Sequence, residues 1–444
     1  MRALLTLFCF SLISFVPAVE KPDIVLFLID DMGREDCGFM GGKDIKTPAI
    51  DKLASAGATL DAFYVMHVCS PTRTCFMTGR HPLRTGLHVG VVRPWAKYGL
   101  PLEERLLPQA LKEVGYSTSI CGKWHLGSFD KAYWPDSRGF DHTYGHLFGA
   151  IDYFKHDRDG QMDWYRNGQP LAEEGYSTQL IAKEAVSVIE KQPQDKPLFL
   201  YLPFNGVHAP HQVPDSYTAP YSHLKGVRKT YAGMLAAVDE AIGHVTTALE
   251  KTGRAKNTLY IFSSDNGGPS PGTVTDNGKY RAGKGSYYEG GTRVAAFATW
   301  EGHIKPGTTI TEPLHAVDWY PTLLKLTGAS LEQKTALDGR DILPVLTDAA
   351  PSPHDHLIIN ASPNGGALRK GDWKIVVTGT QNKAKTKKKK AAKASPGVEL
   401  FNLKNDPYEA NNLASANPEK VTELRALYDR YLSEAAPPKT TEGD

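Results

Sequence analysis

Short apolar runs alternate with amphipathic segments over most of the chain. Nearly continuous apolar runs of strand length, typical of parallel strands buried on both faces of a sheet, occur at 23–29, 197–204 and 258–262. Apolar residues at helical spacing, ended by proline or glycine, predict helices at 47–57, 106–114, 177–193, 226–252 and 318–328. Further strands are expected at 58–65, 116–121 and 293–299. The alternation predicts an α/β fold with a doubly wound sheet.

The pattern changes near residue 350, where the segments become shorter and more polar. Strands are expected at 356–361, 367–377 and 398–403, and a closing helix at 418–435. A chain of 444 residues also exceeds the usual size of one domain. We therefore expect a main domain over residues 21–349, which would carry the chemistry, and a smaller α+β domain over residues 350–444.

The first twenty residues have the pattern of a secretory signal. A basic start precedes an apolar run at 3–16, and Val16-Pro17-Ala18 fits a small-residue cleavage site. Residues 1–20 therefore predict an exported protein, either periplasmic or secreted. No later stretch is long and apolar enough to cross a bilayer, so no membrane span is expected.

Composition is that of an ordinary globular protein, with 41% hydrophobic and 23% charged residues. A formal net charge of only +2 argues against a general polyanion binder such as a nucleic-acid-binding protein. The exception is a basic run at 383–393, which we interpret as a solvated, mobile insertion between two strands. Beyond the signal, Cys37, Cys69, Cys75 and Cys121 are too few for a disulfide scaffold.

Polar residues follow the ends of several predicted strands, where ligands bind in open α/β sheets. Asp30 and Asp31 follow the strand at 23–29, and Asp265 and Asn266 follow the strand at 258–262. All four offer hard oxygen ligands, which favour calcium or magnesium over zinc. Two other strand ends and a glycine-rich loop add candidate binding or catalytic residues, which are Lys123, His125, His208 and Lys284.

The segment from Cys69 to Arg80 carries the nucleophile candidate. Pro71 fits the first turn of a helix, so Cys69 would lie at the N-terminal end of that helix and face a bound anion. Arg73 falls on the same helix face as Cys69. Cys-x-Pro-x-Arg followed by Thr78-Gly79-Arg80 resembles the signature of the formylglycine-dependent sulfatases. The segments 122–127, 279–293 and 400–409 resemble other motifs of the same family.

The resemblance implies an alkaline-phosphatase-like fold, with a large mixed sheet between helix layers and a smaller C-terminal α+β domain. It also implies that a formylglycine-generating or sulfatase-maturating enzyme oxidises Cys69 to formylglycine, which leaves at most one disulfide among the other cysteines. Formylglycine would bind one divalent cation, calcium or alternatively magnesium, together with Asp30, Asp31, Asp265 and Asn266.

In this family the hydrated aldehyde attacks the sulfur of a sulfate ester. The resemblance therefore implies that Lys123 and Lys284 bind the sulfate group and that Arg73 orients the nucleophile. His208 would contact the substrate and protonate the leaving oxygen. His125 would take the proton from the second hydroxyl so that sulfate is released.

Four segments, 106–111, 138–141, 152–153 and 197–202, resemble the branch of arylsulfatase B, the N-acetylgalactosamine-4-sulfatase. This branch implies an exo-acting enzyme on a sulfated carbohydrate with a galactose or N-acetylgalactosamine 4-O-sulfate. The loop and strand-end positions that could form the sugar pocket are His88, Arg93, Trp95, His142 and Tyr153, and His211 is a further candidate contact.

Two alternative functions fit parts of the pattern. A phosphonate or phosphate monoester hydrolase of the same superfamily would share the charge and cation requirements. A non-catalytic sulfated-glycan-binding protein would leave Cys69 unmodified and use the basic run at 383–393 for binding. The combination of acid, base, cation and nucleophile favours the sulfatase.

Overall fold

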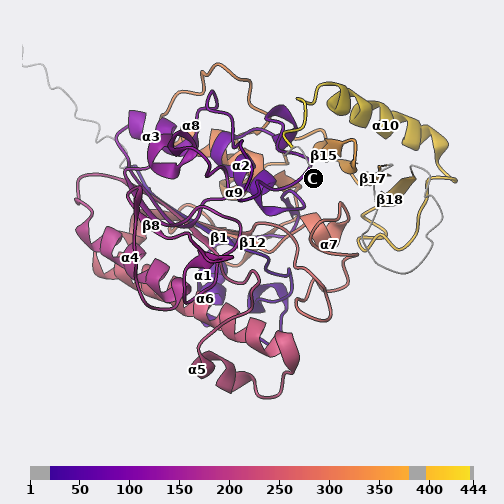
Figure 1. Cartoon of the computed structure of the whole chain (residues 1–444). Coiled ribbons are helices and arrows are strands. Elements are labelled where there is room, and N and C mark those ends of the chain that lie inside the picture. Colours follow the sequence, from indigo (N-terminus) through magenta and orange to yellow (C-terminus); the bar gives the residue numbers. More distant parts are fainter. Residues whose placement is uncertain (1–20, 380–396, 441–444) are drawn as a thin grey trace, which may run out of the picture.

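The computed structural model describes residues 21–379 and 397–440 (Figure 1). The predicted signal at 1–20 and the basic run at 383–393 lie outside these residues. Among the described helices, none is long and apolar enough to cross a membrane.

A ten-stranded mixed sheet forms the centre of the molecule, in the order β13-β2-β12-β11-β1-β10-β4-β5-β8-β9. Its five parallel central strands are β11 (Thr258–Ser264), β1 (Asp23–Ile29), β10 (Leu198–Phe204), β4 (Ser117–Lys123) and β5 (His142–His146). The outer strands are β13 (Thr308–Ile310), β2 (Ala58–Leu60), β12 (Ala296–Thr299), β8 (Tyr165–Arg166) and β9 (Gln169–Pro170). The parallel strands place their carboxyl ends along one edge of the sheet.

Helix layers cover both faces of this sheet, and alternate residues of β1 enter the two cores. Val25, Phe27 and Ile29 pack in the core with α1 (Pro48–Ser55), α4 (Ser177–Lys191) and α6 (Gly226–Lys251). Ile24, Leu26 and Leu28 belong to the core with α2 (Cys69–Thr78), α3 (Leu107–Glu113) and α8 (Trp319–Thr327). Figure 1 shows α4 and α6 on one side of the sheet and α3 and α8 on the other. The predicted fold class is confirmed.

The smaller C-terminal part is a four-stranded antiparallel sheet covered by a helix. Its strands are β15 (Leu357–Ser362), β16 (Gly365–Lys370), β17 (Trp373–Thr378) and β18 (Val398–Asn402), and its helix is α10 (Pro418–Ser433). The remaining short strands and α-helices are β3 (Phe63–Tyr64), β14 (Leu314–His315), β6 (Asp157–Arg158), β7 (Gln161–Met162), α5 (Asp215–Thr218), α7 (Glu289–Thr292) and α9 (Leu343–Thr347). Leu424 and Tyr428 of α10 pack on this sheet.

Two predicted strands are each divided in the structure. The strand expected at 58–65 separates into β2 and β3 at Asp61, whose carboxylate binds Arg34 at 2.6 Å while β3 turns to pair with β14. The segment 367–377 is a hairpin of β16 and β17, because the chain turns at Gly371 with a φ of 56°. In both cases a local turn interrupts an apolar pattern.

A buried ion cluster joins the small sheet to α7. Lys374 Nζ lies 2.8 Å from Glu289 Oε1 and 2.9 Å from Glu409 Oε1. The backbone N–H of Glu289 donates to Glu409 Oε2 at 2.6 Å, and all three residues are buried. Because Glu289 begins α7, directly after the loop that carries Lys284, the cluster holds this loop against the C-terminal sheet.

Glu409 should make stability depend on pH. Burial, together with Glu289 and against Lys374, raises the pKa of Glu409 to about 7. A carboxyl with a raised folded pKa stabilises the protein below its unfolded pKa, about 4.3, and this contribution is lost as the pH rises through 7. Between pH 4 and pH 8 the free energy of unfolding in urea should fall by roughly 3 kcal/mol more in the wild type than in Glu409→Gln.

Glu240→Gln, on the exposed part of α6, is the control for this measurement and should keep the pH slope of the wild type. Equal slopes for the wild type and Glu409→Gln would show that Glu409 does not titrate in this range.

Candidate active site

Four oxygen-bearing side chains meet where β1 and β11 end. The two strands are parallel neighbours with aligned ends, so the residues that follow them lie side by side. Asp265 Oδ1 accepts the backbone N–H of Asp31 at 3.2 Å, and Asn266 Nδ2 donates to Asp31 Oδ1 at 2.8 Å. Asp30 completes the group, and all four residues are buried. The structure therefore brings the four predicted cation ligands together.

Helix α2 begins at Cys69 and points this residue at the same group. The Cys69 thiol donates to Asp30 Oδ1 at 3.4 Å and to Asn266 Oδ1 at 3.6 Å. Burial, Asp265 and Asp30 raise the pKa of the Cys69 thiol. Since the thiolate is the nucleophilic form, an unmodified Cys69 is a weak nucleophile at neutral pH as long as no cation is bound beside it.

Two lysines approach the group from different segments. Lys123 is fully buried and forms an ion pair with Asp30, and Lys284 Nζ lies 2.6 Å from Asp31 Oδ1. Lys284 Nζ also donates to Cys69 Sγ at 3.6 Å. Lys123 was expected to follow a strand but is the last residue of β4, because pairing with β5 continues to this position.

The donor set around Asp30 fits a hard divalent cation. Carboxylate and amide oxygens from two strand ends converge there, as calcium and magnesium require. Burial, with Asp30 as the next cause, raises the pKa of Asp265 to about 6. An ionised carboxylate is unfavourable in such a buried place, and a bound divalent cation would favour the ionised forms of the three aspartates.

A second group of potential ligands, Cys75, His81 and His315, lies in the described core on α2 and near it. His315 Nδ1 accepts the backbone N–H of Val317 at 3.2 Å. The other nitrogen, Nε2, therefore carries the hydrogen in the neutral ring and is a donor instead of a metal ligand. Of the two groups, the acidic one at the strand ends is the candidate cation site.

His125 presents one free ring nitrogen beside the two lysines and Arg73. Its Nε2 donates to the backbone oxygen of Val92 at 3.0 Å, so Nδ1 keeps its lone pair. Burial, followed by Lys123 and Arg73, lowers the pKa of His125 well below its usual value. A Cβ at Gly149 would lie 2.5 Å from the ring, so only glycine fits against it. The neutral ring is held as a proton acceptor.

His208 faces the acidic group from the loop after β10. Its Nε2 lies 3.6 Å from Asp31 Oδ2, and its Nδ1 donates to the backbone oxygen of Ala209 at 2.5 Å. Burial lowers the pKa of His208 to about 4, Asp31 opposes this shift, and Lys123 and Lys284 add to it. A bound anion would offset the two lysines and raise the pKa of His208 again.

Arg73 lies beneath the site, completely buried. Its Nη2 donates to Asp265 Oδ2 at 2.9 Å and its Nη1 donates to the backbone oxygen of Lys123 at 2.9 Å. The guanidinium thus ties β4, α2 and the end of β11 together.

The predicted sugar-pocket residues lie in different places. Arg93 and Trp95 are exposed, Trp95 at 60%, just after Val92, whose backbone contacts His125 and Ser70 Oγ. His88 is fully buried. The prediction of His142 as a pocket residue is wrong. His142 begins β5, at the end of the sheet opposite to the carboxyl ends of the parallel strands, and its Nε2 lies 2.9 Å from Glu184 Oε1.

Tyr153 and His211 lie around the His208 loop. Tyr153 is buried, and its hydroxyl binds the backbone oxygens of Asn205 at 2.6 Å and of His208 at 2.7 Å. It therefore supports the loop and is not a sugar contact. The His211 ring packs against Tyr231, with ring centroids 6.3 Å apart.

Sequence reasoning missed two buried polar residues beside the site, His67 and Asn360. His67 lies two residues before Cys69, which was the available signal. Asn360 comes from β15 in the C-terminal sheet, and nothing in its local sequence connects it with Cys69.

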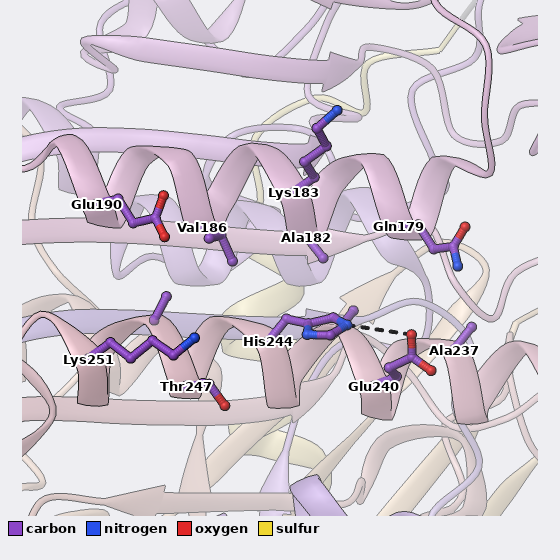
Figure 2. Close-up of a pocket in the computed structure, with 12 residues that line it drawn as sticks. Gln179, Ala182, Lys183, Val186, Glu190, Ala237, Glu240, His244, Thr247 and Lys251 are labelled. Atoms are coloured by element: carbon purple, nitrogen blue, oxygen red, sulfur yellow. Dashed lines mark ion pairs between the residues drawn. The ribbon is translucent and has the colours of Figure 1, made fainter.

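The groove in Figure 2 lies elsewhere, on the outer surface between α4 and α6. It has a volume of about 430 Å³, and its lining includes Lys183 and Glu190 of α4 and His244 and Lys251 of α6. None of the candidate site residues reaches it. Its lining mixes small apolar side chains, mostly alanines, with polar and charged ones, as expected for the outer faces of two packed helices.

The fold and the site define an enzyme with the alkaline-phosphatase-like architecture. A family model described as sulfatase matches residues 22–329, and the chain belongs to this family, the sulfuric ester hydrolases. Arylsulfatase J of Mus musculus is 35% identical over 461 residues, which cover 94% of this chain and 77% of the relative. N-acetylgalactosamine-6-sulfatase of Mus musculus is 33% identical over 353 residues, which cover 74% of this chain and 67% of the relative.

Solved structures agree with this assignment. Ps i-CgsB in complex with k-i-k-neocarrahexaose superposes with a TM-score of 0.86 at 32% identity, covering 95% of this chain and 96% of that one. The phosphonate monoester hydrolase of Agrobacterium radiobacter has a TM-score of 0.64 at 20% identity and shares the fold.

Proposed function

We propose that this sulfatase uses a formylglycine at position 69 and a divalent cation, calcium or alternatively magnesium, to remove a 4-O-sulfate from a terminal galactose or N-acetylgalactosamine. The observation that carries the proposal is the meeting of Cys69 with Asp30, Asn266 and Lys284 at the strand ends.

The side chains around Cys69 would have different roles, which follow from their charges and hydrogen bonds. When bound, the cation would neutralise the carboxylates and increase the nucleophilicity of the hydroxyl at position 69. Lys123 and Lys284 would then turn from Asp30 and Asp31 to the sulfate oxygens and stabilise the charge that develops on them. Arg73 would hold Asp265 and the end of β4 in place.

Two histidines would move the protons. His208 Nε2 faces the acidic group and would donate a proton to the leaving sugar oxygen, once the bound sulfate raises its pKa. His125 Nδ1, free because Nε2 is held by Val92, would accept the proton that is released when sulfate leaves position 69.

The sugar assignment rests on two further observations. One relative is by name an N-acetylgalactosamine sulfatase, and another was solved with a neocarrahexaose. Arg93 and Trp95, exposed next to Val92, could offer a charged and an aromatic contact to a sugar. The 4-O position follows from the resemblance to the arylsulfatase B branch, whereas the named relative is a 6-sulfatase, so both positions need testing.

The test combines a mass measurement with an activity measurement. Formylglycine lowers the mass of the peptide containing position 69 by about 18 Da relative to cysteine. We expect this mass in protein from the native host. We also expect sulfate release from 4-nitrophenyl sulfate and from galactose-type disaccharides sulfated at O4, faster than at O6.

Two results would point to the alternative functions. Faster release of phosphate from 4-nitrophenyl phosphate would favour a phosphate ester hydrolase. An unmodified Cys69, with saturable glycan binding and no release, would favour a binding protein.

A further inference from the structure

A second polar cluster lies beside the proposed nucleophile, formed by His67, His88, Tyr287 and Asn360. The rings of His67 and Tyr287 pack with centroids 4.6 Å apart. Asn360 Nδ2 donates to the Tyr287 hydroxyl at 3.4 Å and to the backbone oxygen of His88 at 3.0 Å. His88 is in turn close enough to lower the pKa of His67. These contacts bring four residues from four different segments into one cluster.

Several polar atoms of this cluster have no hydrogen-bond partner among the described residues. They are Nδ1 of His67, both ring nitrogens of His88 and Oδ1 of Asn360, and all of them are buried. A buried polar atom without a partner costs about 1–3 kcal/mol, so a concentration of such atoms in one place calls for a bound polar group.

The cluster borders the sulfate-binding residues. His67 precedes Cys69 by two residues, and its backbone oxygen accepts the N–H of Gly285, the neighbour of Lys284, at 2.8 Å. His88 begins the segment that continues to Val92, which contacts Ser70 and His125. A sugar whose sulfate group lies between Lys123 and Lys284 would therefore extend toward His67.

The chemistry of the cluster selects a neutral ligand. Its side chains are two imidazoles, a phenol and a carboxamide, without a carboxylate, ammonium or guanidinium group. Uncharged imidazole, phenol and amide groups offer donors and acceptors without net charge. A hydroxyl group, which both donates and accepts, matches this set better than an anion does.

We propose that His67 binds a hydroxyl group of the sugar ring that carries the sulfate ester, and that His88 and Asn360 are positioning residues behind it. Among the three members with unpartnered polar atoms, only His67 keeps part of its surface exposed, 6%, whereas His88 and Asn360 have none. Tyr287 is also partly exposed, but its hydroxyl already contacts Asn360. His67 is therefore the unpartnered member that a ligand can reach. The inference rests on the proposed sulfatase function. It makes His67 a determinant of sugar specificity.

The first test compares substrates with and without the sugar. In His67→Gln, kcat/KM for the preferred sulfated sugar should fall roughly 10- to 100-fold, mainly through KM, because a buried hydrogen bond is lost. The same variant should change kcat/KM for 4-nitrophenyl sulfate less than about 2-fold. His244→Gln, on the exposed surface of α6, is the matched control and should leave both values unchanged.

The second test removes the hydroxyl instead of the histidine. Sulfated sugars that lack one hydroxyl at a time should include one that the wild type hydrolyses as poorly as His67→Gln hydrolyses the parent sugar. For that deoxy sugar, His67→Gln should cause no further loss. Where the variant fails to fold, the wild type still tests the inference, because equal hydrolysis of every deoxy sugar would show that no sugar hydroxyl is bound in this way.

The outcomes separate the two proposals. If the wild type releases no sulfate from any ester, the proposed function is wrong and this inference fails with it. If the wild type is active but His67→Gln affects sugar and aryl sulfates equally, or neither, then His67 is structural, the cluster holds only water, and this inference alone is wrong.

Discussion

Replacing Cys69 with serine is expected to abolish turnover and leave substrate binding intact. Serine cannot be oxidised to the aldehyde by the thiol route, so the variant has one hydroxyl at this position and lacks the second one that would release sulfate by carbon–oxygen cleavage. We expect kcat for 4-nitrophenyl sulfate to fall at least about 1,000-fold, as in enzymes that lose their nucleophile. Lys123 and Lys284 remain, so the substrate should still bind, as measured by calorimetry with the sulfated sugar.

Cys75→Ala is the matched control for this experiment. Cys75 lies on the same helix, is equally buried and belongs to the core. This variant should keep the activity of the wild type after any loss of stability is taken into account. Multiple turnover by Cys69→Ser at the wild-type rate would contradict the formylglycine proposal.

Removing the divalent cation should have the second largest effect. Chelation should lower sulfate release at least about 100-fold, because Asp30 and Asp31 then keep Lys123 and Lys284 away from the sulfate and nothing activates the nucleophile. Added calcium should restore activity and, at a concentration of about 100 Kd, stabilise the chelated protein by about 3 kcal/mol. In Asp30→Asn, added calcium should restore little activity and should stabilise the chelated protein much less.

Asp239→Asn is the control, because Asp239 is also a buried aspartate, yet it accepts the backbone N–H groups of Ala49 and Ile50 at the start of α1. This variant should keep the thermal shift with calcium. Full activity after chelation, with no thermal shift on adding calcium or magnesium, would show that the acidic group does not hold a cation. A larger shift with magnesium would identify that ion instead.

The strands that carry the site could be predicted because they are buried on both faces. β1, β10 and β11 read as continuous apolar runs, and their predicted bounds differ from the observed ones by at most two residues. β5 was missed because His142-Thr-Tyr-Gly-His146 contains polar residues, although most of it is buried between β4 and β8. His142 of β5 binds Glu184, 42 residues further along the chain, and no local pattern contains such a partner.

The sequence by itself determined the α/β class, the strand ends and the residue types at those ends. These are local properties, since an apolar run, a proline in a first turn or adjacent carboxylates act over a few residues. From these, Asp30, Asp31, Asp265 and Asn266 could be proposed as one group, because parallel neighbouring strands end at the same edge.

Only the tertiary structure decided which side chains share that edge with Cys69 and which do not. It excluded His142, which lies at the opposite end of β5, and placed His67 and Asn360 together from segments almost 300 residues apart. It also fixed the hydrogen of His125 on Nε2 through Val92. Such contacts depend on how the layers pack, and packing brings together residues that have no relation along the chain.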